Sequence, residues 1–102
     1  MERFPIVFFE NVTLKCRIDS CCQTGIARQW KGGRYNGIIS YDEGPIDKSK
    51  YYAELTNGGF TLKIMNFDAE DANKNYTCVY GFAIYTDTLT LNSSTYMRKY
   101  KY

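Results

Sequence analysis

The sequence contains no histidine. Histidine is the commonest general acid or base in enzymes and a member of the common catalytic triads, so its absence excludes those mechanisms. The neighbouring carboxylates Asp42-Glu43 and Glu70-Asp71 lie in polar segments typical of turns. The glycine pairs Gly32-Gly33 and Gly58-Gly59 are typical of hairpins rather than of phosphate-binding loops. We therefore expect that the protein is not an enzyme and that it binds no cofactor.

Long apolar runs are missing as well. The apolar segment at residues 4–9 is interrupted by Pro5 and is far shorter than the ~20 residues that a transmembrane helix needs. No signal peptide is recognisable. The formal net charge of +2 is too small to indicate a nucleic-acid partner, and the basic residues Arg98, Lys99 and Lys101 indicate an exposed tail. We expect a domain excised from a longer protein, attached to a membrane only through an anchor outside this chain.

Aromatic residues, by contrast, are abundant: ten Tyr, six Phe and one Trp favour strands and binding surfaces. From Val12 to Ile18, apolar and polar residues alternate, which predicts a strand with one buried face. Similar patterns predict strands at residues 4–9, 35–41, 50–55, 60–64, 76–80 and 86–91, and one more that carries Trp30. Residues 31–34 and 56–59 are the expected turns.

The four cysteines are Cys16, Cys21, Cys22 and Cys78, and four cysteines allow three pairings. Cys21 and Cys22 are adjacent, so their Cα atoms lie about 3.8 Å apart, below the usual separation in a disulfide. A vicinal bond between them would be strained. The alternatives are two free thiols, or a bridge to another chain or to a missing part of this one. We expect no metal site, because no histidine and no further cysteine lies nearby.

Three sequons for N-linked glycosylation are present, at Asn11, Asn75 and Asn92. Each asparagine is followed two positions later by a threonine or serine. Short motifs recur by chance, but we expect at least one of the three sites to be occupied in a eukaryotic or viral glycoprotein.

One spaced set of residues is more specific than any other feature of the chain. It comprises Cys16, Trp30, Leu62-Lys-Ile64, Asp71 and Tyr76-Thr-Cys78. An inter-sheet disulfide, a Trp packed against it and a Tyr two residues before the second Cys mark immunoglobulin domains. The chain therefore resembles the immunoglobulin superfamily over roughly residues 9–91. The long segment between the third strand and residue 50 resembles the variable-type (V-set) arrangement.

The resemblance implies an all-β fold, a two-sheet antiparallel sandwich of variable type spanning residues 1–95, with a basic tail or linker at 96–102. It implies a Cys16–Cys78 disulfide, which persists only in an oxidising compartment, and so an extracellular domain, secreted or at the cell surface. The implied core includes Trp30, Leu62, Ile64 and Tyr76. The Tyr76 hydroxyl should bond backbone near Asp71 or Ala72, and Lys50 should pair with Asp71, with Asp68 as second choice.

In V-set domains, the sheet that holds the last two strands and the third strand often meets protein partners. Strand alternation places Gln29, Lys31, Thr77 and Val79 on the outer face of this sheet, with Trp30, Cys78 and Tyr80 inside. Aromatic residues before and after those strands would border the face. The predicted partner-binding residues are Gln29, Lys31, Tyr35, Tyr41, Val79, Phe82, Ile84 and Tyr85.

The resemblance thus implies a recognition domain of an immune-type receptor or ligand, or of an adhesion protein. Its partner would be a protein, either another immunoglobulin-superfamily domain or a second copy of this chain, and not a nucleic acid. Two alternatives stay open: a structural spacer that binds nothing, and a viral mimic of a host receptor. Residues 86–91 lack the glycines that follow the corresponding strand of antigen receptors, which argues against a rearranging receptor.

Overall fold

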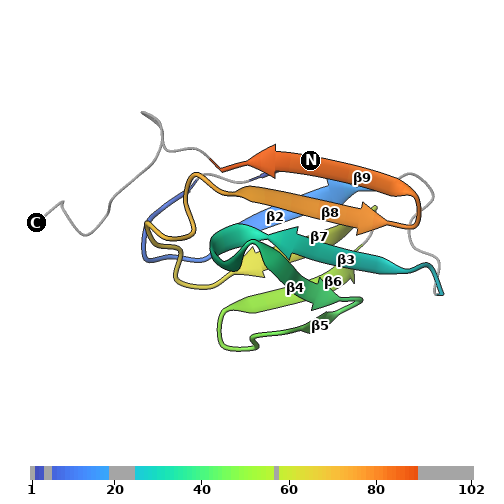
Figure 1. Cartoon of the computed structure of the whole chain (residues 1–102), viewed down its shortest axis with the longest axis horizontal. Helices are drawn as coiled ribbons and strands as arrows, with labels where there is room; N and C mark the ends of the chain where they lie inside the picture. Colours follow the sequence, from blue (N-terminus) through green and yellow to red (C-terminus); the bar gives the residue numbers. More distant parts are fainter. Residues whose placement is uncertain (1, 4–5, 19–24, 57, 90–102) are drawn as a thin grey trace, which may run out of the picture.

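The computed structural model describes residues 2–3, 6–18, 25–56 and 58–89, which form two antiparallel sheets packed as a sandwich (Figure 1). One sheet has the strand order β1-β2-β7-β6 and the other has the order β5-β4-β3-β8-β9. We call them the four-stranded and the five-stranded sheet. Their strands are β1 (Glu2–Arg3), β2 (Val12–Arg17), β7 (Gly59–Ile64), β6 (Tyr51–Thr56), β5 (Gly44–Pro45), β4 (Gly37–Tyr41), β3 (Arg28–Gly32), β8 (Asn75–Tyr80) and β9 (Ala83–Thr88). A single 3-10 turn, η1 (Gly33–Tyr35), connects β3 to β4.

The core lies between the two sheets and is built around the disulfide. Cys16 of β2 is bonded to Cys78 of β8, with a Cα–Cα distance of 6.4 Å, which confirms the expected pairing. Trp30 pairs with Cys78 across β3 and β8 and packs against Phe60 of the opposite sheet, with ring centroids 5.7 Å apart. The side chains of Trp30, Leu62, Ile64 and Tyr76 are all fully buried. The alternating residues of both sheets therefore meet in one apolar layer, as their sequence pattern predicts.

The expectation of a strand over residues 4–9 is wrong for the described part of that segment. Within residues 6–9 only Val7 forms an isolated β-bridge, and Phe9 adopts a positive φ of 68°. Ile6 and Phe8 are nevertheless buried, and Phe8 packs against Phe67 with ring centroids 5.9 Å apart. The apolar character of the segment thus reflects burial under the end of the sandwich rather than a regular strand.

The last two strands form a tighter hairpin than the sequence suggested. The strands predicted at residues 76–80 and 86–91 leave a loop of five residues, 81–85, between them, but β9 begins at Ala83, directly opposite Tyr80. Only Gly81 and Phe82 make the turn, and Gly81 has a φ of 59°. A glycine at the first of two turn residues is typical of the type II′ hairpin, whose twist matches the flanking strands.

β3 also extends further than expected, to Gly32, within the segment that we predicted as a turn. Gly32 has a φ of 108°, and a Cβ atom at this position would lie 2.0 Å from the carbonyl oxygen of Asn75. Only glycine allows the two backbones to approach so closely. The following strand, β4, consequently begins at Gly37 rather than at residue 35.

Several predictions concern residues outside the described part of the chain. These are the state of Cys21 and Cys22, the sequon at Asn92, and the basic tail at residues 96–102. Among the residues that are described, no helix has the length and apolar character needed to cross a membrane.

Candidate functional site

The outer face of the five-stranded sheet is defined by the register of its strands. Residues directly opposite one another in antiparallel strands point to the same side of a sheet. Gln29 lies opposite both Val79 and Tyr41, and Val79 lies opposite Ile84. Two residues further along β3, Lys31 lies opposite Ile38 of β4 and Thr77 of β8, and Thr77 lies opposite Thr86 of β9. Asn75 and Thr88, two residues beyond Thr77 and Thr86, lie opposite each other on the same side. The face therefore consists of Gln29, Lys31, Ile38, Tyr41, Asn75, Thr77, Val79, Ile84, Thr86 and Thr88.

Tyr85 does not belong to this face, contrary to its place among the predicted partner-binding residues. It lies opposite Cys78, so its side chain is on the inner side of the sheet. It is still exposed, because β9 is the last strand in the order of the five-stranded sheet. The prediction treated residues 81–85 as a loop, and the two-residue turn instead places Ile84 on the outer face and Tyr85 on the inner side.

Exposed apolar side chains are concentrated on the five-stranded sheet and its connections. Phe82 projects from the β8–β9 turn with a relative accessibility of 106%, so it contacts little of its own domain. Among the described residues, the large hydrophobic side chains that are exposed elsewhere are those of Phe9 and Tyr52. Those on the five-stranded sheet and its connections are Tyr35, Ile38, Tyr41, Ile46, Phe82, Ile84 and Tyr85.

The opposite outer face, on the four-stranded sheet, has a different composition. Its alternating positions on β2, β7 and β6 carry Lys15, Arg17, Lys63 and Glu54 beside three threonines and Tyr52. Lys31 is the one charged residue among the ten that form the outer face of the five-stranded sheet. Since interface cores are depleted of charge and enriched in aromatic side chains, the five-stranded sheet has the composition of a contact surface.

An open hollow of about 340 Å³ lies at one end of this face. Gln29, Tyr41 and Val79 contribute side chains from three adjacent strands, and Gly81 borders the hollow directly beside Phe82. Ala27, Arg28 and Asp42 complete its wall. An apolar side chain of another molecule could enter the hollow while Phe82 contacts the same molecule from the turn.

Arg28 lies at the edge of the hollow, at a position two residues before Trp30 where V-set domains usually have an apolar residue. It is opposite Tyr80 in the register, on the inner side of the sheet. Its guanidinium bonds Glu43 and donates to the carbonyl oxygen of Ile26 at 2.9 Å. Asp42 lies 3.8 Å from the same guanidinium. These partners hold the β4–β5 turn against the start of β3.

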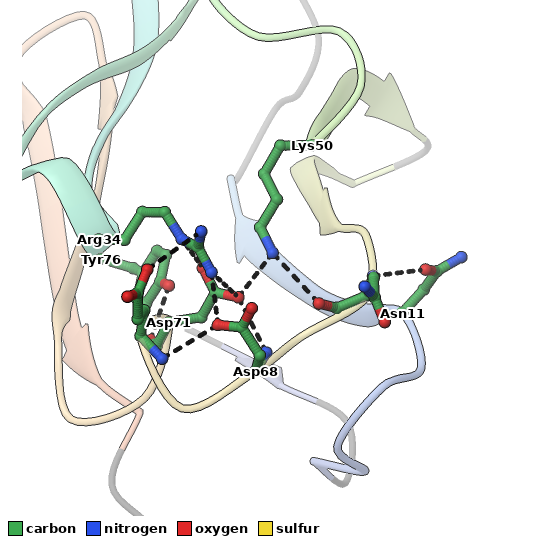
Figure 2. Close-up of polar contacts among 8 residues, drawn as sticks. Asn11, Arg34, Lys50, Asp68, Asp71 and Tyr76 are labelled. Atoms are coloured by element: carbon green, nitrogen blue, oxygen red, sulfur yellow. Dashed lines mark hydrogen bonds and ion pairs between the residues drawn. The ribbon is translucent and has the colours of Figure 1, made fainter.

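A cluster of charged side chains lies at the other end of the sandwich (Figure 2). Asp71 is at its centre, with an exposed fraction of 0%. Its Oδ1 accepts a hydrogen bond from Arg34 Nε at 2.9 Å, and its Oδ2 accepts one from Lys50 Nζ at 2.7 Å. The ion pair between Lys50 and Asp71 is thus as expected. Arg34 also bonds Asp68, the second choice for that pairing.

The charges of this cluster shift one another's pKa values. The hydrogen bond to Asp71 is the main reason that the pKa of Arg34 lies above its ordinary value. Burial acts to raise the pKa of Asp68, but hydrogen bonds from Arg34 and the Glu70 backbone outweigh burial, and the pKa is lowered overall. Both directions favour the charged forms, so the cluster is a stable set of ion pairs at neutral pH.

Arg34 links this cluster to the candidate contact surface. It belongs to η1, and its guanidinium carbon lies 5.9 Å from the ring centroid of Tyr35, which is exposed. The buried anchor on Asp71 therefore fixes the connection between β3 and β4 and presents Tyr35 to solvent.

The tyrosine corner is also present. The Tyr76 hydroxyl donates to the carbonyl oxygen of Asp71 at 2.8 Å, where the sequence predicted it. Tyr76 is fully buried, and burial raises its pKa above the ordinary value for tyrosine. This hydrogen bond ties the loop that holds Asp68 and Asp71 to the beginning of strand β8.

Ile38, Thr86, Thr88 and Arg34 were not predicted as site residues from the sequence. Ile38 lies on the outer face, and the only signal for it was its place in the segment 35–41. Arg34 had no signal at all, because its partner Asp71 is 37 positions away.

Comparisons with solved structures agree with this architecture. A chain in the crystal structure of Dpr11 IG1 bound to DIP-gamma is 20% identical to this one, with a TM-score of 0.67. The match covers 84% of this chain and 93% of that chain. A chain of the ZIG-8–RIG-5 IG1–IG1 heterodimer is 11% identical, with a TM-score of 0.67, and the match covers 85% and 79% of the two chains.

The I9–I11 tandem from titin is also similar, at 21% identity and a TM-score of 0.64. That match covers 90% of this chain and 29% of the titin chain. No protein-family model matches the sequence, and no curated protein matches it either. At these identities the likeness establishes the fold.

The chain is an all-β domain with the immunoglobulin fold. It is of the variable type, because β4 and β5 extend the sheet that contains β3, β8 and β9. Among solved structures it is similar to the immunoglobulin domains of Dpr11, of the ZIG-8–RIG-5 heterodimer and of titin.

Proposed function

We propose that this domain is an extracellular recognition module that binds a protein partner through the outer face of its five-stranded sheet. The observation that carries the proposal is the contrast between the two outer faces. The outer face of the five-stranded sheet has apolar and aromatic side chains and a single charged residue, Lys31. The outer face of the four-stranded sheet carries four charged residues, Lys15, Arg17, Glu54 and Lys63. A surface of the first kind is typical of an interface.

The expected partner is another immunoglobulin domain or a second copy of this chain. Two of the similar structures support this, because they are complexes between immunoglobulin domains, Dpr11 with DIP-gamma and ZIG-8 with RIG-5. The extracellular location is supported by the Cys16–Cys78 disulfide, since such bonds persist in oxidising compartments. We propose no catalytic role.

The test uses the domain tetramerised on streptavidin as a probe against an array of secreted and cell-surface ectodomains of the source organism, itself included. For any ectodomain that binds, Phe82→Ala and Ile84→Ala should each weaken binding by about 2 kcal/mol or more, roughly 30-fold, as hot-spot residues do. Neither change should lower the melting temperature, because both side chains are exposed.

Lys63→Ala is the matched control, because Lys63 is an exposed residue at the centre of the opposite outer face. It should leave binding unchanged. Loss of binding in the Lys63 variant, with normal binding by the Phe82 and Ile84 variants, would assign the contact to the four-stranded sheet and contradict the proposal.

The spacer function is the second candidate, and the similarity to a tandem of titin domains favours it. A spacer would bind no ectodomain of the array, and alanine at Phe82 would have no effect beyond solubility.

A further inference from the structure

One sequon lies on the proposed contact face itself. Asn75 is the first residue of β8 and begins the sequence Asn75-Tyr76-Thr77. Tyr76 is fully buried, so Asn75 and Thr77 point to the opposite, outer side of the five-stranded sheet. Asn75 is exposed and lies opposite Thr88 of β9. An oligosaccharide attached here would begin on the face rather than behind it.

Within the described residues, one hydrogen bond orients the amide of Asn75. Its Oδ1 accepts a hydrogen bond from the hydroxyl of Thr88. Within the described part of the chain, no residue accepts a hydrogen bond from its Nδ2, the nitrogen to which an N-linked glycan is joined. The carbonyl side of the amide is therefore held by the sheet, and the attachment nitrogen is left for modification.

Asn75 also borders a second hollow on the same face. This hollow has a volume of about 390 Å³, and its wall includes Lys31, Ile38 and Thr77. The first hollow, beside Phe82, lies at the other end of β8. Since a strand rises about 3.3 Å per residue, the five steps from Asn75 to Tyr80 separate the two ends of β8 by roughly 17 Å. The face thus has one half next to Asn75 and another half next to Phe82.

The sequon at Asn11 provides a comparison within the same domain. Asn11 immediately precedes β2, in the four-stranded sheet, and is exposed. Its Oδ1 accepts a hydrogen bond from the backbone nitrogen of Asn66 at 3.1 Å (Figure 2). A glycan at Asn11 would start from the other sheet and would leave Lys31 uncovered.

We infer that Asn75 carries an N-linked glycan that covers the half of the outer face around Lys31 and Ile38, so that a protein partner contacts only the half around Gln29, Val79 and Phe82. The glycan occupies the second hollow with its first sugars, and the bulk of the oligosaccharide shields the adjacent strands. The restriction on the partner rests on the proposed function, whereas the place of the glycan does not.

The experiment uses the whole chain secreted from cultured eukaryotic cells, as wild type, Asn75→Gln and Asn11→Gln. Intact mass, before and after glycan removal, gives the occupancy of each site. An amine-reactive acetylating reagent then measures the labelling rates of Lys31 and Lys63 by peptide mass spectrometry. We expect Asn75→Gln to lose one glycan and to label at Lys31 several-fold faster than wild type, with the Lys63 rate unchanged. Asn11→Gln should lose one glycan and keep the wild-type rate at Lys31.

If Asn75→Gln is not secreted, an endoglycosidase that leaves a single sugar on folded wild-type protein replaces it, and the same acceleration at Lys31 is expected. An unmodified Asn75, or a Lys31 rate that does not respond to loss or trimming of the glycan, would overturn the inference. Neither the glycan occupancy nor the labelling rate involves a partner. A failed array screen would therefore count against the proposed function and not against the glycan at Asn75.

Discussion

Arg34→Met tests whether the charged cluster is a structural anchor. The substitution keeps an unbranched side chain but removes the guanidinium that bonds Asp71 Oδ1 at 2.9 Å. In the described part of the chain, no other residue bonds that oxygen, whereas Oδ2 also accepts from Lys50 and from the backbone nitrogen of Asp68. Asp71 is fully buried, so the variant leaves a buried carboxylate oxygen without its hydrogen bond.

The magnitude follows from this geometry. Breaking a buried ion pair by removing one partner costs about 3–5 kcal/mol. We take the lower end, about 3 kcal/mol, because Lys50 still compensates the charge of Asp71. Lys50→Met should cost less, about 2 kcal/mol, because Oδ2 keeps its bond from the Asp68 backbone.

Urea unfolding followed by the fluorescence of Trp30, the only tryptophan and a fully buried one, measures both losses. Glu43→Gln is the control, because it removes the ion pair with Arg28 at the other end of the domain, where the carboxylate is exposed. An exposed pair contributes about 0–1 kcal/mol. If Arg34→Met costs no more than Glu43→Gln, the cluster does not anchor the fold and the reasoning from burial is refuted.

Four further predictions concern stability. Cys78→Ser should cost about 4 kcal/mol or prevent folding, since it removes a cross-link over a sequence separation of 62, and non-reducing peptide mapping of the wild type should show Cys16 bonded only to Cys78. Tyr76→Phe should cost about 1 kcal/mol in urea unfolding, the usual worth of one buried hydrogen bond, and an unchanged midpoint would contradict the role of the hydroxyl. Burial raises the pKa of Tyr51 to about 12, so the folded state keeps its phenol proton where the unfolded chain loses it, and stability should fall as the pH rises from 10 to about 12. The pKa of Asp68 is lowered in the folded state, so the ionised carboxylate stabilises the fold above the unfolded pKa of 3.8, and this stabilisation is lost as the pH falls below that value. In Asp68→Asn, the urea midpoint should therefore decline less steeply with falling pH than in the wild type.

Much of the fold could be predicted because alternation is a local property. Gln29 and Val79 on one side, with Trp30 and Cys78 on the other, follow from a period of two within each strand. The position of Tyr85 could not be predicted in the same way. Its side depends on whether the β8–β9 connection has two residues or five, and the sequence around Gly81 allows both.

Contacts between distant segments were the least predictable. The Lys50–Asp71 pair was expected only through the resemblance to V-set domains, and Arg34 joins the same carboxylate from a turn with no recognisable motif. The backbone conformation at Gly32 is likewise set by the approach of another strand. Such features depend on tertiary packing, which a single sequence does not encode in any short pattern.

The Cys16–Cys78 bond has a mechanical consequence. If a pulling force acted on the two ends of this chain, the bond would carry the load past everything between the two cysteines, a separation of 62 residues. At about 3.5 Å per extended residue, roughly 200 Å of chain could not be drawn out. Only the segments outside the bond would lengthen: Trp30, β3 and β4 lie within the closed loop, whereas Val79 and β9 follow Cys78 and lie outside it. Under tension, the part of a contact made by β3 and β4 would therefore be kept in the closed loop, and the part made by β9 would be the first to be drawn out.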